Sequence, residues 1–86
     1  MISTLGRLIA QRRRDLGMSQ RDLAERLCLE TGRPTVTRHE LSRYERGIRQ
    51  PNRTTLTALA TVLDLPITNL TTAAVRQRED AAFHPT

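Results

Sequence analysis

The sequence predicts a small all-α domain of five helices, and three observations lead to that prediction. Apolar residues recur at three- and four-residue spacing, as they do on one face of an amphipathic helix. Helix-initiating residues precede these stretches, and glycine or proline follows most of them. No segment shows the alternation of apolar and polar residues that marks a strand. The 86 residues support one domain with a small, mainly aliphatic core, because only 2% of the chain is aromatic.

A helix-initiation signature occurs twice, in residues 18–23 and in residues 36–41. Each copy has an apolar residue, a hydroxyl, two variable positions, an acid and a leucine. The hydroxyl accepts a hydrogen bond from the first turn, the acid bonds back to the N–H of the capping residue, and the apolar residue packs on the leucine. The signatures therefore predict capping boxes of Ser19 with Asp22 and of Thr37 with Glu40.

The first two helices are bounded by clear stop signals. The first is expected over residues 4–16, before Gly17, with an apolar face of Leu5, Leu8, Ile9 and Leu16. The second is expected from the Ser19 cap to Thr31, where Gly32-Arg33-Pro34 stops it, with Leu23, Ala24 and Leu27 on one face.

The remaining three helices follow from the same reasoning. The third is expected from the Thr37 cap to about Arg46, burying Leu41 and Tyr44 and closed by Gly47. The fourth is expected from the Asn52 cap to Leu63, where Asp64-Leu65-Pro66 breaks it. The fifth is expected from near Thr68 toward Ala82.

Charge is distributed unevenly around a formal net charge of +5. Residues 1–17 carry four arginines against one aspartate, and residues 38–53 carry five arginines against two glutamates. All fourteen basic residues are arginine, which suits forked contacts with phosphate or guanine but which a GC-rich coding bias also explains. A basic surface is typical of nucleic-acid binding, although many solvated faces are also basic.

Other function classes find little support in the sequence. Cys28 is the single cysteine and cannot form an internal disulfide, so it is expected as a small apolar residue of a cytoplasmic protein. We see no signal peptide and no stretch that would span a membrane. Cys28, His39 and His84 match no metal-ligand spacing, and there is no glycine-rich phosphate loop. No enzymatic activity, cofactor or metal site is expected.

Three stretches together resemble the Cro/repressor-like (XRE) helix-turn-helix domain of bacteria and phages. They are residues 17–27 (GMSQRDLAERL), residues 41–47 (LSRYERG) and residues 51–63, within a resemblance that extends over residues 5–70. The resemblance implies a lambda-repressor-like fold over residues 1–70, with residues 71–86 as a C-terminal helix extension and tail. It also implies that the third helix lies in the major groove of DNA with its N-terminal residues at base edges.

The chain departs from the family between its second and third helices. Members usually join these helices through a turn of about four residues, whereas residues 28–36 form a longer, extended turn here. The extra residues either prolong the second helix by a turn or add a loop. Arg33 and Thr35 are candidates for additional DNA contacts, and a passive surface loop is the alternative.

Roles for individual residues follow from the resemblance. The residues expected at base edges are Thr37, Arg38, His39, Ser42 and Arg43. The residues expected at phosphates are Ser19, Gln20, Arg33, Arg46, Arg49, Asn52 and Arg53. For each of these the alternative is an ordinary solvated side chain. Glu45 is expected to pair with Arg13 in a partly buried, structural ion pair, whereas Arg12 and Arg14 are expected on a solvated face.

The resulting expectation is a transcriptional regulator, more specifically a repressor, that binds double-stranded DNA as a homodimer. The fifth helix is the candidate dimer surface through Leu70, Ala74, Val75 and Phe83, unless the same stripe packs back onto the first and fourth helices. Two alternatives remain. The chain is an antitoxin that binds a toxin protein and autoregulates its operon, or it is a protein-only adaptor.

Overall fold

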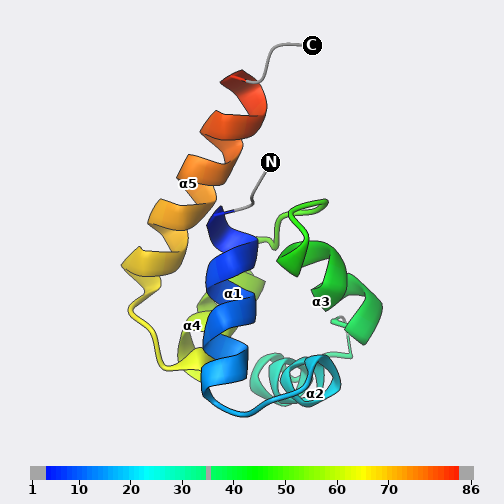
Figure 1. Ribbon diagram of the computed structural model, residues 1–86. Helices are drawn as coiled ribbons and strands as arrows, with labels where there is room; N and C mark the ends of the chain where they lie inside the picture. Colours follow the sequence, from blue (N-terminus) through cyan, green and yellow to red (C-terminus); the bar gives the residue numbers. More distant parts are fainter. Residues whose placement is uncertain (1–3, 35, 84–86) are drawn as a thin grey trace.

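The computed structural model describes the backbone of residues 4–34 and 36–83, and every regular element in that part of the chain is an α-helix (Figure 1). The five helices are α1 (Thr4–Asp15), α2 (Gln20–Thr31), α3 (Arg38–Glu45), α4 (Arg53–Leu63) and α5 (Ile67–Phe83). The all-α prediction with five helices is therefore confirmed, and the helix boundaries agree with the expected ones to within about two residues.

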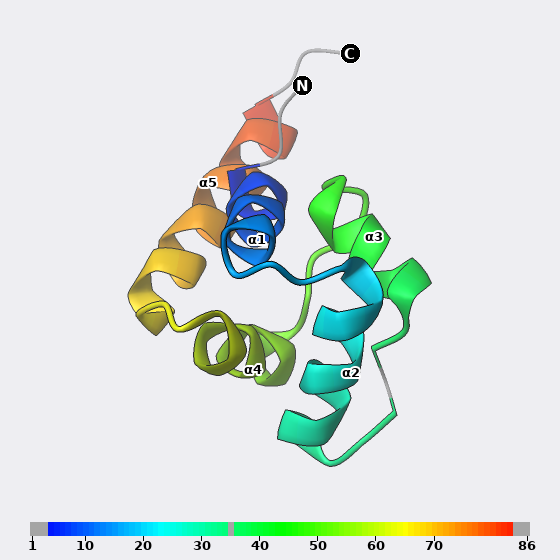
Figure 2. The same cartoon turned by 60° about the horizontal axis from the view of Figure 1, so that its bottom comes forward.

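The helices surround a single core, with α1 in the middle of the bundle. In Figures 1 and 2, α1 lies between α5 on one side and α3 on the other, and α2 lies beneath α3. α1 packs against α5, α3 and α4, while α2 packs against α4 and α3. α3 is thus held from two sides, by α1 and by α2.

Aliphatic side chains from all five helices build the core. The largest fully buried side chains are Leu5, Ile9, Leu23, Leu27, Leu41, Leu59, Leu63 and Leu70. Each contributes about 1.5–3 kcal/mol by leaving water. Leu16 does not join them, contrary to expectation. α1 ends at Asp15, the chain turns at Gly17 with a φ of +72°, and Leu16 stays 42% exposed.

The two capping signatures fold differently. Ser19 closes a full box with Asp22, since each backbone N–H donates to the other's side chain at 3.0 Å. At α3, the Glu40 N–H donates to the Thr37 hydroxyl at 3.1 Å, but the Glu40 carboxylate turns to Arg49 and Arg43. The second box is therefore only half formed, because two arginine partners attract the acid away from the Thr37 N–H.

Two helix ends are capped by side chains from distant helices. Gln77 on α5 is buried, and its Oε1 accepts from the backbone N–H groups of Leu5 and Gly6 in the first turn of α1. Arg12 on α1 donates from Nε to the Leu63 carbonyl in the last turn of α4 at 2.8 Å. Arg12 was expected on a solvated face. It is instead half-buried, because the unpaired carbonyl at a helix end attracts a cation.

The fifth helix packs on its own domain. Leu70 and Ala74 are buried in the common core, so they are not available as the dimer surface for which they were candidates. Gln50 in the α3–α4 loop donates to the Ala74 carbonyl at 2.9 Å and accepts from Arg78 at 3.3 Å, which fixes α5 to that loop. Val75 remains 43% exposed, and the Phe83 side chain lies outside the described part.

The long connection between α2 and α3 combines the two forms that the sequence left open. α2 continues through Cys28 to Thr31 and ends at Gly32, whose left-handed φ of +71° lets its N–H bond to the Cys28 carbonyl. The chain then returns toward α3 and becomes buried again at Val36. Arg33 is exposed on this return segment, while Thr35 lies outside the described residues.

Candidate nucleic-acid interface

One face of α3 is buried and the opposite face is open. Leu41 and Tyr44 point into the core and are 0% and 6% exposed. The side chains expected at base edges lie on the other face, where Thr37, Arg38, His39 and Arg43 are exposed and Ser42 is half-buried. The eight residues of α3 thus present a short polar surface rich in arginine, with the Thr37 cap at its start.

An ion pair attaches α3 to α1. Arg13 donates from Nε to Oε2 of Glu45 at 2.7 Å and from Nη2 to Oε1 at 3.1 Å. The two side chains are only 11% and 6% exposed. Gln20 on α2 donates to the same Glu45 carboxylate at 3.0 Å. The pair implied by the resemblance is therefore present, and Gln20 connects α2 to it.

A basic hollow of about 540 Å³ lies at the N-terminus of α2. It is lined by Arg13, Ser19, Gln20, Arg21 and Arg38. The structure thus brings Ser19 and Gln20, both expected at phosphates, next to Arg38, which is expected at a base edge. Unpaired N–H groups at a helix start and arginine side chains both attract anions. The sequence did not lead us to predict Arg21 as part of this site, although its position directly after Gln20 indicated it.

Glu40 holds two of the arginines on this surface. Its carboxylate lies 2.7 Å from Nε of Arg49 and 3.5 Å from Nη1 of Arg43. The arginine side chains remain 64% and 53% exposed, so both are accessible while paired. The negative charge of the Glu40 carboxylate also reduces the net positive charge of the surface around the first turn of α3. Nothing in the sequence pattern alone predicted that the acid of the capping signature would take this role.

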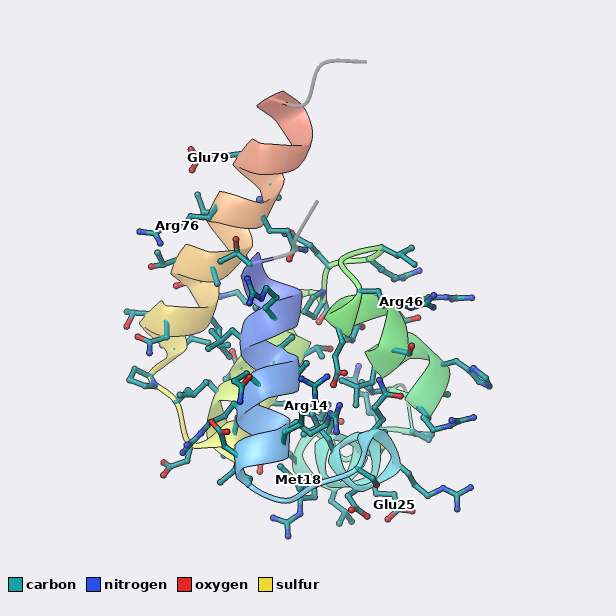
Figure 3. All side chains as sticks on the ribbon, in the orientation of Figure 1. Arg14, Met18, Glu25, Arg46, Arg76 and Glu79 are labelled. Carbon is teal, nitrogen blue, oxygen red and sulfur yellow. The ribbon has the colours of Figure 1, made fainter. Side chains whose placement is uncertain are left out.

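The remaining predicted phosphate residues do not form one cluster. Arg46 extends from the end of α3 into solvent (Figure 3). The Asn52 side-chain oxygen accepts from the Thr55 N–H at 2.9 Å and caps α4. Arg53 lines a separate hollow with Glu30 at the end of α2. Arg46 and Arg49 therefore remain near α3, whereas Arg53 faces a different part of the surface.

The ring of Tyr44 lies beneath this surface. Burial of the ring raises the pKa of Tyr44, and the nearby Glu40 carboxylate raises it further. The neutral phenol is therefore the favoured form, and Tyr44 acts as a core residue that supports α3 from inside.

Neither a candidate metal site nor a candidate membrane span occurs among the described residues. Among residues 4–34 and 36–83, no group of three or more His, Cys, Asp or Glu side chains is placed to hold a metal ion. Within the same part of the chain, no helix has the length and apolar character needed to cross a membrane. The exposed arginines of α3 and the basic hollow beside them are the features that suggest nucleic-acid binding.

Comparison with known proteins agrees with this geometry. No curated protein and no solved structure matches the chain. The family model described as Helix-turn-helix matches residues 9–70, which include α2, α3 and α4 in full. The chain therefore belongs to the helix-turn-helix family of DNA-binding regulators.

Proposed function

We propose that this protein binds double-stranded DNA sequence-specifically and represses transcription, with α3 in the major groove. The observation that carries the proposal is the exposure of Arg38 and Arg43 on a helix whose other face is locked into the core. Arginine forms two parallel hydrogen bonds with guanine O6 and N7, which distinguishes guanine from the other bases. A repressor can act by occupying its operator, so this role requires no protein surface beyond the one that binds DNA.

Rigid attachment of α3 supports readout of base edges. The Arg13–Glu45 pair and the Gln20 bond connect α3 to α1 and α2 through distances of 2.7–3.1 Å. A recognition helix must present its side chains at a fixed depth and angle, because displacement by one base pair changes every contact.

Phosphate contacts are assigned to the basic hollow and to the end of α3. In this proposal Ser19 and Gln20, which line the basic hollow at the start of α2, meet one phosphate, and the exposed Arg46 and Arg49 meet another. Such contacts fix the orientation of the protein without reading sequence. A DNA target and a free Cys28 both favour a cytoplasmic location.

The test is selection of bound sites from random duplexes, followed by two variants on the selected site. Arg43→Ala is expected to cost about 1–3 kcal/mol of binding free energy and to relax preference at one base pair. Gln20→Ala is expected to weaken binding to all sequences nearly alike, because it removes a contact with the DNA backbone and one of the bonds that hold α3 as a unit. A two-fold symmetric site would indicate two copies per operator.

Arg76 on α5 provides the matched control, because it is exposed and points away from α3 (Figure 3). Arg76→Ala removes the same charge from the protein and is expected to leave base preference unchanged. Selection without a preferred sequence, or an Arg43→Ala variant that keeps its full preference, would contradict the assignment of α3.

A further inference from the structure

We propose that the groove between α2 and the segment that returns to α3 binds a small organic anion with an apolar body, and that its occupancy weakens DNA binding through Arg38. The binding part of this inference rests on the groove alone. The coupling to DNA rests on the function proposed above.

The groove arises from the long α2–α3 connection. α2 continues one turn past Leu27 to Thr31, and residues 32–34 and 36–37 face α2 across the space before α3 begins. The two segments form an open groove with a volume of about 780 Å³. Pockets for small ligands measure about 300–1,000 Å³ and are mostly apolar, with a few polar groups.

Apolar side chains from both segments line this groove. α2 contributes Ala24, Cys28 and Leu29, and the return segment contributes Pro34 and Val36. Leu29 is 83% exposed, which is the largest exposed fraction of any large apolar side chain among the described residues. Covering Leu29 with an apolar ligand removes that surface from water, which provides a driving force for binding.

The charged residues on the groove define the charge of the ligand. Arg21, Arg33 and Arg38 line it together with a single acid, Glu25. Figure 3 shows Glu25 on the lower face of α2, pointing away from α3. A carboxylate or sulfonate is therefore complementary to the arginine-lined rim, whereas a cationic ligand is not.

Arg38 connects the groove to the DNA-binding surface. It lines the groove, it lines the basic hollow at the start of α2, and it is the first residue of α3. A guanidinium paired with a ligand anion in the groove is not available to a base or a phosphate at the same time. Ligand and DNA therefore compete for one side chain, which requires reciprocal weakening of their affinities.

The first experiment measures binding of two dyes to the full chain by fluorescence. Anilinonaphthalenesulfonate carries an anion on an apolar aromatic body, and N-phenylnaphthylamine has a closely similar body without the anion. We expect the sulfonate to bind one site per chain and more tightly than the neutral dye. Equal affinities for the two dyes would overturn the assigned role of the arginines.

Leu29→Asn tests the apolar wall, with Ile67→Asn as its control. Ile67 is another exposed apolar residue, 41% exposed, and it lies at the start of α5 away from the groove. Leu29→Asn is expected to weaken sulfonate binding about tenfold, which corresponds to about 1.4 kcal/mol of lost apolar contact. Circular dichroism and thermal unfolding confirm that each variant is folded. Equal loss in both variants would show non-specific dye binding and overturn the site.

Cys28 gives an independent measure of location. It is the only cysteine of the chain and lines the groove, so its alkylation by iodoacetamide reports occupancy directly. Saturating sulfonate is expected to slow alkylation at least about fivefold, and unchanged alkylation would overturn the assigned location.

The final measurement is DNA affinity with and without saturating sulfonate. We expect about fivefold or greater weakening in the parent chain. The Leu29→Asn variant, which keeps every proposed DNA contact, should bind DNA as the parent does but lose most of the response. If the chain binds no DNA at all, the proposed function fails while the dye and alkylation results still decide the ligand site. If DNA binds but does not respond to a bound sulfonate, the coupling through Arg38 is wrong.

Discussion

Arg13 on α1 and Glu45 on α3 form a two-pronged ion pair in which both side chains are nearly buried. The third guanidinium nitrogen of Arg13 donates to the Met18 carbonyl at 2.8 Å, in the turn before α2. Gln20 of α2 completes the arrangement by donating to Glu45. One acidic side chain therefore fixes the relative positions of α1, α2 and α3.

Loss of Glu45 is expected to destabilise the fold far more than loss of a surface ion pair. Glu45→Ala should lower the free energy of unfolding by about 3–5 kcal/mol, because Arg13 is left buried without its counter-charge. Arg49→Ala removes the exposed partner of Glu40, which keeps its contact with Arg43, and should cost about 0–1 kcal/mol. Urea unfolding followed by circular dichroism measures both. The double variant Arg13→Met with Glu45→Leu should recover much of the loss, and equal costs for the two single variants would refute this account.

Neutralising Glu40 is expected to strengthen non-specific DNA binding. Glu40→Gln releases Arg43 and Arg49 from their ion pairs and removes a negative charge from the proposed interface. Each additional phosphate that is neutralised steepens the dependence of log affinity on log salt by about 0.9. Titration of random-sequence duplexes at several salt concentrations measures this slope. Glu30→Gln at the end of α2 is the control, and an identical slope for both variants would refute the role of Glu40.

Tyr44 is expected to lose its proton only well into the alkaline range. Burial and the Glu40 charge raise the pKa of Tyr44 above its usual value of about 10. A raised folded pKa means that the contribution of the neutral phenol to stability is complete below the unfolded pKa and is lost as pH rises through the folded one. Tyr44 is the only tyrosine and the chain has no tryptophan, so tyrosinate absorbance reports it alone.

Glu40→Gln provides the check on the cause of the Tyr44 shift. It should move the titration of Tyr44 to lower pH than in the parent chain, because it removes a nearby negative charge and frees Arg49. If Tyr44 has the same pKa in the folded protein as in the chain unfolded by denaturant, the burial of its ring and its contact with Glu40 are wrong.

Gln77 is expected to be important for stability although it lies near the end of the chain. Gln77→Leu removes the acceptor of two backbone N–H groups at the start of α1 and should cost about 1–3 kcal/mol. Gln11→Ala, which removes an exposed glutamine from the same helix bundle, should change the free energy of unfolding by about 0.5 kcal/mol or less. Hydrogen exchange of the Leu5 and Gly6 amides measures the local effect. Unchanged exchange in Gln77→Leu would contradict the capping role.

Asp22 is expected to contribute stability that acid removes. The bond from the Ser19 backbone N–H, followed by the Ser19 hydroxyl, lowers the pKa of Asp22 below its usual value. A lowered folded pKa means that the contribution is present above the unfolded pKa and is lost as pH falls through the folded one. Asp22→Asn should therefore show a smaller fall in unfolding free energy between about pH 6 and about pH 2 than the parent. If the unfolding free energies of Asp22→Asn and the parent fall in parallel with pH, the Ser19–Asp22 capping box makes no net contribution to stability.

Local features of the fold were readable from the sequence because they depend on neighbouring residues. The caps at Ser19, Thr37 and Asn52 and the helix stop at Gly32 each involve groups within four positions of one another. The same proximity explains why the helix bounds were predicted closely. The resemblance supplied the expectation that Arg13 would meet Glu45, which no local rule provides.

Only the tertiary structure decided which charged and polar side chains leave the solvent. Arg12 bonds to Leu63, Gln77 bonds to the start of α1, and Glu40 turns from its own helix end to Arg49. The two partners in each of these bonds lie far apart along the chain, or the bond competes with a local one. Whether each bond forms therefore depends on how the helices pack. The sequence determined where each helix begins and ends and that α3 is rich in arginine. Packing decided that Leu70 and Ala74 belong to the core rather than to a second copy, because α5 covers apolar surface that α1 and α4 would otherwise leave in water.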